Sequence, residues 1–292
     1  MNSSTTDFNI DNIGRRIFRL PFCLRRYKMD FNELYNIKDE FEQINRTYDI
    51  FNEETRLKSK AGRVEFLTTV KYIEKYLKPG MKILDIGAGT GAYSFYFAEK
   101  GFEVSALELA DNNIAVFRQK MKPEHNIELI QGNAVDLSCF ADESFDIVLM
   151  FGPLYHLHSE EDRQKAIAEA KRVAKKDAIL FFAFIGNDMV FITELGYDAN
   201  YIKTGDYNRE TFKMDDFPFV FHTVDGCRKI LENGGIKIMH EVASDGVSEL
   251  MAQRINELDD EDYETYLRYH YYCCEKPEML GRSSHLLFIG KK

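Results

Sequence analysis

The segment from Met81 to Gly91, with the sequence MKILDIGAGTG, restricts the folds open to this chain more than any other segment. Apolar residues lead to Asp85, and three glycines follow at alternate positions, the first two being Gly87 and Gly89. The apolar run predicts a buried parallel strand. The glycines predict a tight turn into a helix, at which the backbone comes close to a ligand.

Strand-like and helix-like segments alternate along the chain on both sides of this turn. The further predicted strands are Glu103–Leu107, Ile127–Ile130, Phe145–Met150, Ala178–Ile185, Ile236–Val242 and Leu286–Ile289. Between most of them lie stretches with helical periodicity or capping residues, such as Ser159 with Asp162 before a helix. This alternation predicts an α/β fold with a doubly wound, mostly parallel seven-stranded sheet.

Composition excludes several classes of function. The 292 residues are 45% hydrophobic, which suffices for one large domain or for one domain with a cap. The net charge of -10 disfavours general binding to nucleic acid, because an acidic surface repels phosphate. Five irregularly spaced cysteines predict reduced thiols in a cytoplasmic protein. No apolar run is long enough to span a membrane, so stable membrane association is not expected.

The chain divides into three predicted parts. Residues 1–28 form a basic tail, which we expect to be mobile, although a membrane-surface or partner-binding arm is the alternative. Residues 29–60 are helical in pattern and form either a lid or a helix packed on the edge of the domain. Residues 61–292 form the main domain, with a helical and aromatic cap inserted at about residues 186–222 and 246–283.

The glycine turn resembles motif I of the class I S-adenosylmethionine-dependent methyltransferases, an acid followed by G-x-G-x-G. In this chain the motif runs from Asp85 to Gly91. The same letters satisfy the looser dinucleotide fingerprint, because Gly87, Gly89 and Ala92 fit G-x-G-x-x-A. The turn alone therefore leaves two cofactors open.

The end of the second predicted strand carries Glu108. The ends of successive parallel strands line one crevice, where a carboxylate can accept hydrogen bonds from both ribose hydroxyls of a nucleotide cofactor. The alternative is a helix-capping acid, a role that Asp111 fills better. Dehydrogenases and methyltransferases share this carboxylate, so Glu108 does not distinguish them.

The third strand end favours the methyltransferases. Gly132-Asn133-Ala134 resembles the G-D-A motif of that family, in which the side chain of the middle residue faces the adenine amino group. Asn offers a carbonyl acceptor, as Asp does. The alternative is an Asn in an ordinary tight turn.

The fourth strand end, in the segment FDIVLMFGPLYHL, resembles a bacterial group of small-molecule methyltransferases. The resemblance implies that backbone at Phe151 meets the methionine part of the cofactor and that the loop from Pro153 to His158 faces the acceptor. Tyr155 and His156 are therefore the catalytic candidates. His156 could accept a proton near neutral pH, and the alternative is that both residues only position the loop or the substrate.

The resemblance also implies a set of contacts around S-adenosylmethionine. Asp85 would help to hold the methionine ammonium, and Tyr48 and Arg56 would belong to the lid. The last strand would lie antiparallel between the fifth and the sixth. The implied cofactor-binding residues are Asp85, Gly87, Ala88, Gly89, Gly91, Glu108, Leu109, Asn133, Ala134 and Phe151.

We therefore expect an S-adenosylmethionine-dependent methyltransferase that acts on a small-molecule acceptor by in-line displacement. The alternatives are an NAD(P)-dependent oxidoreductase and a non-catalytic S-adenosylmethionine-binding protein. A metal site is not expected, because His270, Cys273 and Cys274 lack a second ligand pair at suitable spacing.

Overall fold

A single mixed sheet forms the centre of the molecule. The computed structural model describes residue 34 and residues 36–50 and 57–292. Its eight strands follow the order β3-β2-β1-β4-β5-β8-β7, with β6 paired to β5. The strands are β1 (Lys82–Ile86), β2 (Glu103–Glu108), β3 (Ile127–Gln131), β4 (Phe145–Met150), β5 (Ala174–Gly186), β6 (Phe221–His222), β7 (Lys237–Ala243) and β8 (His285–Lys291).

The predicted doubly wound, mostly parallel sheet is confirmed. Strands β1 to β5 pair in parallel, and β8 lies antiparallel between β5 and β7. The sheet has eight strands rather than seven because Phe221–His222 pairs with the end of β5. A strand of two residues has no periodic pattern, so the sequence could not predict it.

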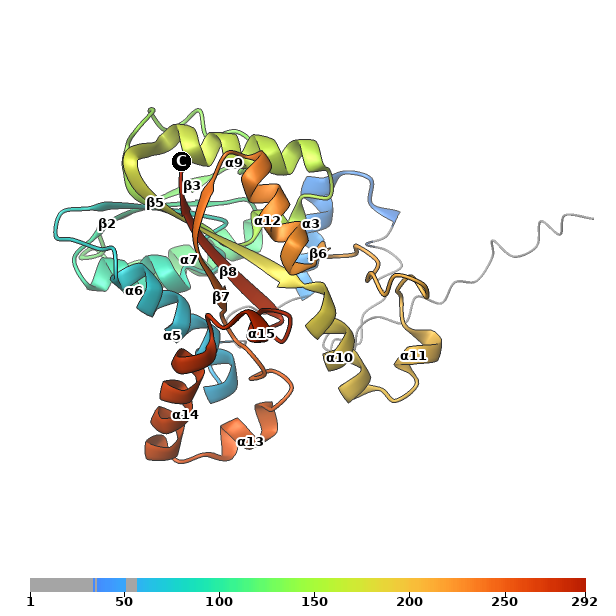
Figure 1. Cartoon of the computed structure of the whole chain (residues 1–292). Helices are drawn as coiled ribbons and strands as arrows, with labels where there is room; N and C mark the ends of the chain where they lie inside the picture. Colours follow the sequence, from blue (N-terminus) through green and yellow to red (C-terminus); the bar gives the residue numbers. More distant parts are fainter. Residues whose placement is uncertain (1–33, 35, 51–56) are drawn as a thin grey trace, which may run out of the picture.

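Helices cover both faces of the sheet (Figure 1). They are α3 (Glu40–Ile50), α5 (Lys60–Glu74), α6 (Ala92–Glu99), α7 (Asp111–Lys120), α8 (Pro153–His156), α9 (Glu160–Val173), α10 (Asn187–Tyr197), α11 (Tyr201–Thr204), α12 (Val224–Asn233), α13 (Ala252–Glu257), α14 (Asp260–Cys273) and α15 (Pro277–Leu280). Neighbouring strand residues point to opposite faces. Ile83 accordingly packs with α5 and α6, whereas Leu84 packs with α9 and α12. Two buried apolar layers thus hold the sheet in place.

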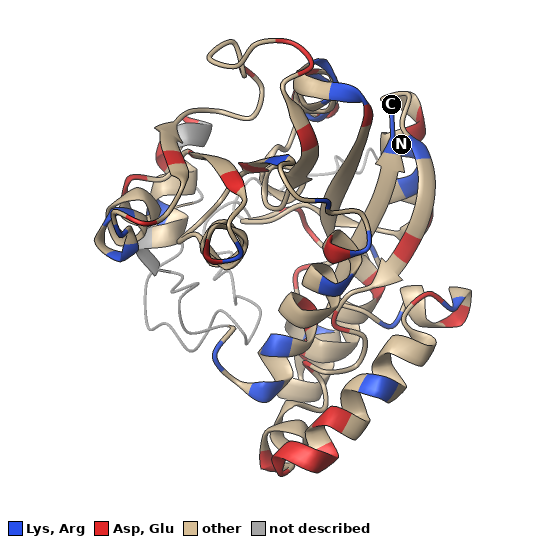
Figure 2. Cartoon of the chain, turned by 90° about the vertical axis from the view of Figure 1, so that its left-hand side faces the viewer, with Lys and Arg blue, Asp and Glu red and all other residues tan. Residues whose placement is uncertain are grey.

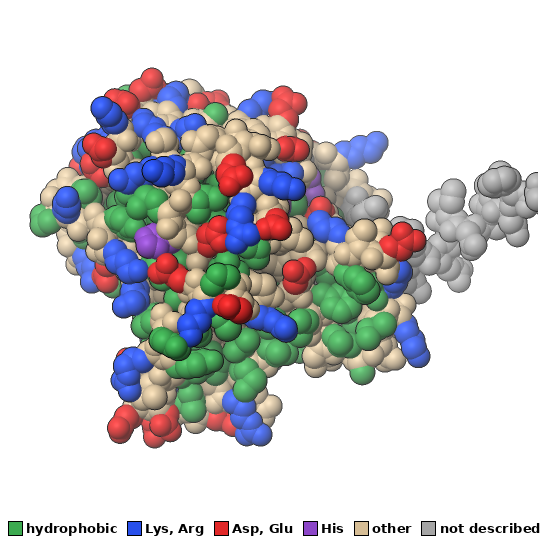
Figure 3. Space-filling model, in the orientation of Figure 1, with side chains coloured by type: hydrophobic (Ala, Val, Ile, Leu, Met, Phe, Trp, Pro, Cys, Tyr) green, Lys and Arg blue, Asp and Glu red, His purple; other side chains and the backbone are tan. Residues whose placement is uncertain are grey.

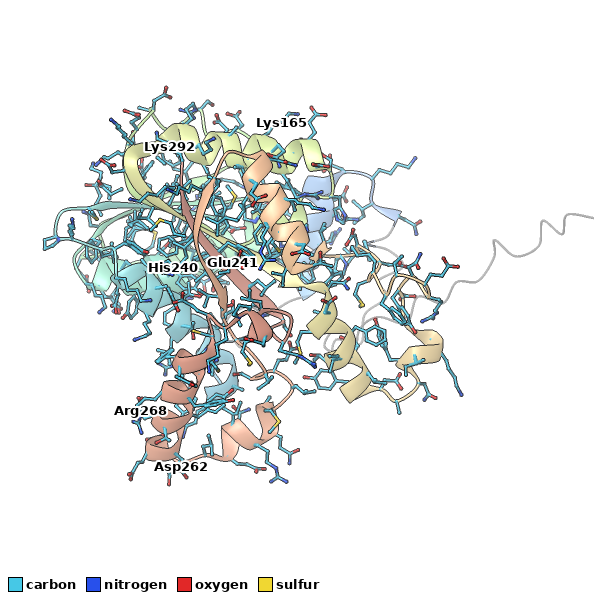
Figure 4. The ribbon with its side chains drawn as sticks, viewed as in Figure 1. Lys165, His240, Glu241, Asp262, Arg268 and Lys292 are labelled. Carbon is cyan, nitrogen blue, oxygen red and sulfur yellow. The ribbon has the colours of Figure 1, made fainter. Side chains whose placement is uncertain are left out.

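The polar side chains of β7, one of the two edge strands, show the same alternation. Figure 4 labels two neighbours on it, His240 and Glu241. His240 bonds to Tyr76 and Glu275 on the α5 side of the sheet. Glu241 forms a two-pronged ion pair with Arg228 of α12 on the other side.

Side-chain caps fix the starts of three long helices. Ser59 accepts a hydrogen bond from the backbone N–H of Gly62 at the start of α5. Ser159 does the same for Asp162 at the start of α9, which confirms the predicted capping box. Asp259 caps α14, whose first turn carries three further acids, visible at the end of that helix in Figure 2. Acids at a helix N-terminus are stabilised by the helix dipole.

Two segments lie outside the sheet and its covering helices (Figure 1). The first follows β5 and contains α10 and α11, before β6 returns the chain to the sheet. Its aromatic residues pack on one another, and Tyr201, Tyr207 and Phe221 form a buried cluster with Ile185 at the end of β5. The aromatic residues that had no periodic pattern in the sequence therefore build a small core of their own.

The second segment contains α13 and α14, which pack against α5, and α15, whose Leu280 packs in the core of the sheet. Val64 of α5 meets Ile255, Tyr263 and Leu267 in a separate buried cluster. The Lys60 side chain adds a hydrogen bond to the carbonyl of Leu258. Helices α13 and α14 are thus attached to the domain mainly through α5.

The predicted basic tail, residues 1–28, and the predicted lid residue Arg56 lie outside the described residues. Within the described part of the chain, no helix has both the length and the apolar character that a membrane crossing requires.

Candidate active site

The glycine turn follows β1 directly and takes the predicted conformation. Gly87, Gly89 and Gly91 have φ angles of 76°, 56° and 87°, a region that residues with a Cβ rarely adopt. A Cβ at Gly87 would lie 2.8 Å from Pro153, and one at Gly91 would lie 2.6 Å from Phe117. A Cβ at Gly89 would meet no atom within 4 Å. Gly87 and Gly91 are therefore required for packing, whereas Gly89 borders open space.

Two cavities meet at this turn, and Gly87 and Tyr48 line both. The smaller, of about 50 Å³, is lined by the ends of β2 and β3 and by α8. The larger, of about 320 Å³, is lined by the rest of the glycine turn, by α5 and by the ends of β5, β7 and β8. The carboxyl ends of the parallel strands thus form one crevice, as expected for this topology.

Glu108 links the glycine turn to the start of α7. One carboxylate oxygen accepts from the N–H of Gly89 at 2.7 Å, and the other accepts from the N–H of Ala110 at 2.8 Å. Burial raises the pKa of Glu108, and these hydrogen bonds oppose that rise. The residue lies at the wall of the smaller cavity, next to Leu109 and Asn133, as the sequence predicted for a ribose acceptor.

Asp85 has an incomplete set of partners. Its side chain is buried, and one oxygen accepts from the hydroxyl of Ser94 at 2.6 Å. The other oxygen has no hydrogen-bond partner within the described part of the chain. Burial raises the pKa of Asp85 to about 6, and the nearby charge of Glu108 adds to the rise. Because Asp85 lines the larger cavity, a cationic donor in that cavity would complete it.

Asn133 lies at the end of β3 and lines the smaller cavity with Ala134. Its side-chain oxygen accepts from the N–H of Val135 at 3.1 Å, which shapes the turn. Asn133 therefore stabilises the turn, as the alternative interpretation expected. It also lies beside the cavity, as the adenine contact would require.

The two catalytic candidates lie on different cavities. Tyr155 lines the larger cavity together with Asp85 and Phe151. His156 lines the smaller cavity together with Glu108 and Asn133. The sequence placed both residues near the transferring methyl. In the structure they are neighbours on α8 that face different cavities.

The surroundings of His156 favour a positioning role. Its ring is buried, and Nε2 lies 2.8 Å from the hydroxyl of Tyr48 on α3. Burial lowers the pKa of His156 to about 3. Such a ring is neutral at pH 7 and is a weak proton acceptor. It connects α3 to α8 instead.

Sequence reasoning missed His285, which lines the larger cavity, and its hydrogen-bond partner Asp245. His285 begins β8, and Asp245 follows the end of β7. Their side chains are 2.8 Å apart. No motif marks them, but the antiparallel placement of the last strand was a usable signal. It puts the start of β8 at the edge where the parallel strands end.

Among the cysteines that the structure describes, none lines either cavity. Within the described residues, no group of three or more His, Cys, Asp or Glu side chains is placed to hold a metal ion. Cys273 and Cys274 are buried near the end of α14, and His270 is buried on the same helix. All three pack against neighbouring elements, outside both cavities.

Residues 84–182 match the sequence family described as a methyltransferase domain, and they contain the glycine turn and the ends of β2, β3 and β4. This part of the chain is similar to a methyltransferase domain, and the sheet has the class I methyltransferase fold. The chain is 33% identical over 144 residues to a demethylmenaquinone methyltransferase of Lysinibacillus sphaericus, which covers 48% of this chain and 58% of that protein. A demethylmenaquinone methyltransferase of Listeria welshimeri is 34% identical over 146 residues, which covers 46% of this chain and 56% of the relative.

The chain spans about half the length of the curated relatives that it matches. Solved structures resemble it over more of the chain. A protein from Pyrococcus horikoshii has a TM-score of 0.56 at 20% identity, covering 84% of this chain and 98% of that one. A methyltransferase from Thermotoga maritima, described as a possible histamine N-methyltransferase, has a TM-score of 0.53 at 17% identity, covering 87% and 100%. These two likenesses show the fold.

S-adenosylmethionine is the cofactor of this family, and the residues of the crevice fit it. The unpartnered oxygen of Asp85 can accept from the methionine ammonium. The open space at Gly89 leaves room for the cofactor to approach the backbone. Together these two observations place a cation-accepting group and an unobstructed backbone in one cavity.

Proposed function

We propose that this protein transfers the methyl group of S-adenosylmethionine to a small-molecule acceptor by in-line displacement. The observation that carries the proposal is the buried carboxylate of Asp85, which has one unpartnered oxygen at the wall of the larger cavity. A nicotinamide cofactor has no ammonium group that would complete this carboxylate. A methionine ammonium would, in the position that motif I of the family provides.

The other residues of the crevice support the same assignment. We assign Glu108 to the ribose and Asn133 to the adenine, because both line the smaller cavity beside Gly87. Phe151 and Tyr93 stack edge to face, 4.9 Å apart, at the wall of the larger cavity. Aromatic faces attract cations, so this pair suits a sulfonium.

The cofactor supplies an activated methyl group with a good leaving group. The protein therefore needs mainly to hold the acceptor in line and to exclude water. We assign Tyr155 to contact with the acceptor, because it lines the larger cavity with Asp85. We assign His156 and Tyr48 to positioning, because their hydrogen bond joins α3 to α8 at the smaller cavity.

We propose a small molecule rather than a nucleic acid as the acceptor. The chain has a net charge of -10. On the face shown in Figure 3, basic and acidic side chains are interspersed, without a broad basic stripe. A nucleic acid would require such a stripe to hold its phosphates.

Thermal melts with single cofactors test the cofactor assignment against the oxidoreductase alternative. S-adenosylmethionine and S-adenosylhomocysteine should each raise the melting temperature, and NADH and NADPH should not. At 100 times its dissociation constant, a ligand stabilises the folded state by about 2.7 kcal/mol. A shift with a nicotinamide and none with S-adenosylmethionine would refute the proposal.

A turnover screen then separates the enzyme from a non-catalytic binding protein. Amines, phenols and thiols should be tested with S-adenosylmethionine, and the release of S-adenosylhomocysteine should be measured. A quinol belongs in the screen because two relatives are named demethylmenaquinone methyltransferases. Binding of the cofactor without methylation of any acceptor would favour the binding protein.

A further inference from the structure

The four-residue helix α8 contributes one side chain to each of the two cavities. Tyr155 lines the larger cavity, and His156 lines the smaller. The backbone N–H groups of Tyr155 and Leu157 bond to carbonyls earlier in the same turn. The carbonyls of Leu154 and Tyr155 find no partner inside so short a helix, because the last turn of a helix leaves its carbonyl groups unpaired. They need donors from another part of the fold.

Residues 219–222, the β6 segment, supply both donors. The backbone N–H of Val220 donates to the carbonyl of Tyr155 at 2.8 Å. Nε2 of His222 lies 3.2 Å from the carbonyl of Leu154. Val220 and His222 are both buried. One short segment, more than sixty residues further along the chain, thus pairs two successive carbonyls of α8.

The carbonyl of Leu154 determines the tautomer of His222. Burial lowers the pKa of His222 to about 4, so its ring is neutral at pH 7 and carries one N–H. A carbonyl oxygen can only accept, so this N–H lies on Nε2. The ring also packs edge to face on Phe184 of β5, with ring centres 5.3 Å apart. His222 is therefore an oriented donor to α8.

Phe219 adds a contact between side chains. Its ring packs edge to face against Tyr155 and His156, with ring centres 6.0 and 5.1 Å apart. Aromatic rings attract each other in this arrangement. One residue of the β6 segment thus touches both side chains that α8 contributes to the cavities.

The β6 segment is attached in turn to the sheet and to the aromatic residues around α10 and α11 (Figure 1). Strand β6 pairs with the last two residues of β5. The backbone N–H of Phe221 donates to Asp216 at 3.0 Å, and its side chain packs in the buried cluster with Tyr201 and Tyr207. The position of α8 is therefore tied to that cluster.

The aromatic cluster lies behind the cavity wall. Among the described residues that line the two cavities, none belongs to residues 187–222. Tyr155 nevertheless packs against the cluster from the cavity side. An uncharged cluster outside a cavity affects binding there chiefly through the positions of the residues that line it.

We propose that the β6 segment positions Tyr155 for the methyl acceptor, with Phe219, Val220 and His222 as positioning residues. This inference rests on the proposed function, in which Tyr155 contacts the acceptor. In-line displacement requires the acceptor to be held within a narrow range of positions, and a misplacement of about 1 Å can cost about 10²-fold in rate. His156 is also held by Tyr48 of α3, so the cofactor side of the crevice should depend less on the β6 segment.

The first test observes α8 in the full-length protein and needs no acceptor. His222→Leu removes the donor to Leu154, so amide hydrogen exchange in residues 155–157 should become about 2–10-fold faster, the effect of one lost hydrogen bond. His222→Gln offers a side-chain N–H in place of Nε2–H and should restore most of the protection. Exchange in β4 should stay unchanged, which shows that the sheet is intact.

The matched control is His240→Leu. It removes the ring hydrogen bonds of His240 to Tyr76 and Glu275, on a strand that does not contact α8. Exchange in α8 should match the wild type in this variant. Unchanged exchange in α8 of His222→Leu would overturn the proposal.

The second test is a double-mutant cycle on an acceptor found by screening amines, phenols and thiols. His222→Leu should lower kcat/KM for that acceptor by up to about 10²-fold and leave the dissociation constant of S-adenosylmethionine nearly unchanged. His222→Gln should recover most of the loss. Because His222 acts through Tyr155, His222→Leu should have little further effect in a Tyr155→Ala background, which a merely structural role would not produce.

Phe219→Leu keeps the proposal testable if His222→Leu does not fold. It retains an apolar side chain but removes the ring contacts to Tyr155 and His156. It should also lower kcat/KM for the acceptor, and its effect should also be small in the Tyr155→Ala background.

The outcomes separate this inference from the proposed function. Faster exchange in α8, with a loss of kcat/KM that is absent in the Tyr155→Ala background, supports both. Faster exchange with unchanged methylation, or losses that multiply in the double variant, overturn the positioning role and leave the methyltransferase intact. Binding of S-adenosylmethionine without methylation of any acceptor overturns both.

Discussion

At the scale of single residues, Gly89 differs from the other two glycines of the turn. It has a positive φ of 56°, but a Cβ at this position would have no neighbour within 4 Å, whereas Gly87 and Gly91 are packed. A side chain at Gly89 would therefore occupy cofactor space rather than protein space. Backbone strain and cofactor exclusion can be measured separately at this residue.

We expect Gly89→Val to reduce the affinity for S-adenosylmethionine by about 100-fold or more, or ~2.7 kcal/mol. The variant should still fold, with a loss of about 1–2 kcal/mol from the left-handed backbone. Gly101→Val is the matched control, because Gly101 has a φ of 86°, borders open space and lies at the end of α6. Equal losses of affinity in both variants, measured by calorimetry, would place Gly89 outside the cofactor site.

The raised pKa of Asp85 predicts that the stability of the fold depends on pH. The pKa of this residue is raised from 3.8 to about 6, so the folded state holds this proton more tightly than the unfolded chain does. The free energy of unfolding of the wild type should therefore fall by about 3 kcal/mol through this group as the pH rises from about 4 to about 6. Asp85→Asn should melt higher than the wild type at about pH 8 and similarly at about pH 4. A difference that is the same at both values would contradict the raised pKa.

The same substitution should have the opposite effect on the cofactor. An ammonium partner favours ionised Asp85, so the wild-type affinity should decrease as the pH falls below about 6. Asp85→Asn should bind S-adenosylmethionine weakly and with little dependence on pH. Calorimetry across this range measures both.

At the scale of elements, α3 lies over the crevice and is joined to α7 and α8 by hydrogen bonds. Asn45 accepts from the N–H of Asp111 at the start of α7, and Tyr48 bonds to His156 of α8. A helix in this position can serve as a lid if it opens to admit the cofactor and closes over it. The lid that the sequence predicted at residues 29–60 therefore stays a prediction, with α3 as the part that can be tested.

Tyr48→Phe should loosen this lid. It removes the hydrogen bond to His156, which is worth about 0.5–1.5 kcal/mol. Hydrogen exchange in residues 40–50 should become faster, and the affinity for S-adenosylmethionine should fall, while the melting temperature changes little. Tyr96→Phe is the control, because it removes a hydroxyl contact to Glu74 between α6 and α5. Similar exchange in α3 in both variants would argue against the lid.

The strand ends that carry a sequence motif were predictable, and those that carry none were not. The turn from Asp85 to Gly91 requires glycines at fixed positions, so its sequence was enough to predict it. His285 and Asp245 depend on how β7 and β8 fold back against β5, which is set by contacts between distant segments. The separation of Tyr155 from His156 depends on the helical rotation of the four-residue α8, a detail that no periodic pattern records.

At the scale of the whole molecule, the sheet and the helices α13 and α14 have separate cores. The sheet is packed by two large apolar layers, and the segment meets α5 through a small cluster that includes Leu267. Glu65, which faces His285, lies on the same helix as that cluster. The segment therefore supports one wall of the larger cavity and leaves the glycine turn to the sheet.

Leu267→Ala should destabilise this segment first. Removing a buried leucine side chain costs about 2–5 kcal/mol, and Leu267 is 3% exposed. Exchange should become faster in α13 and α14, and the affinity for S-adenosylmethionine should stay near that of the wild type. Leu180→Ala, in the centre of β5, is the comparison and should lower the stability of the whole sheet, including the glycine turn. If Leu267→Ala instead accelerates exchange across β1 and β2, the two cores unfold as one unit, and the acceptor and cofactor sides of the crevice cannot be altered independently.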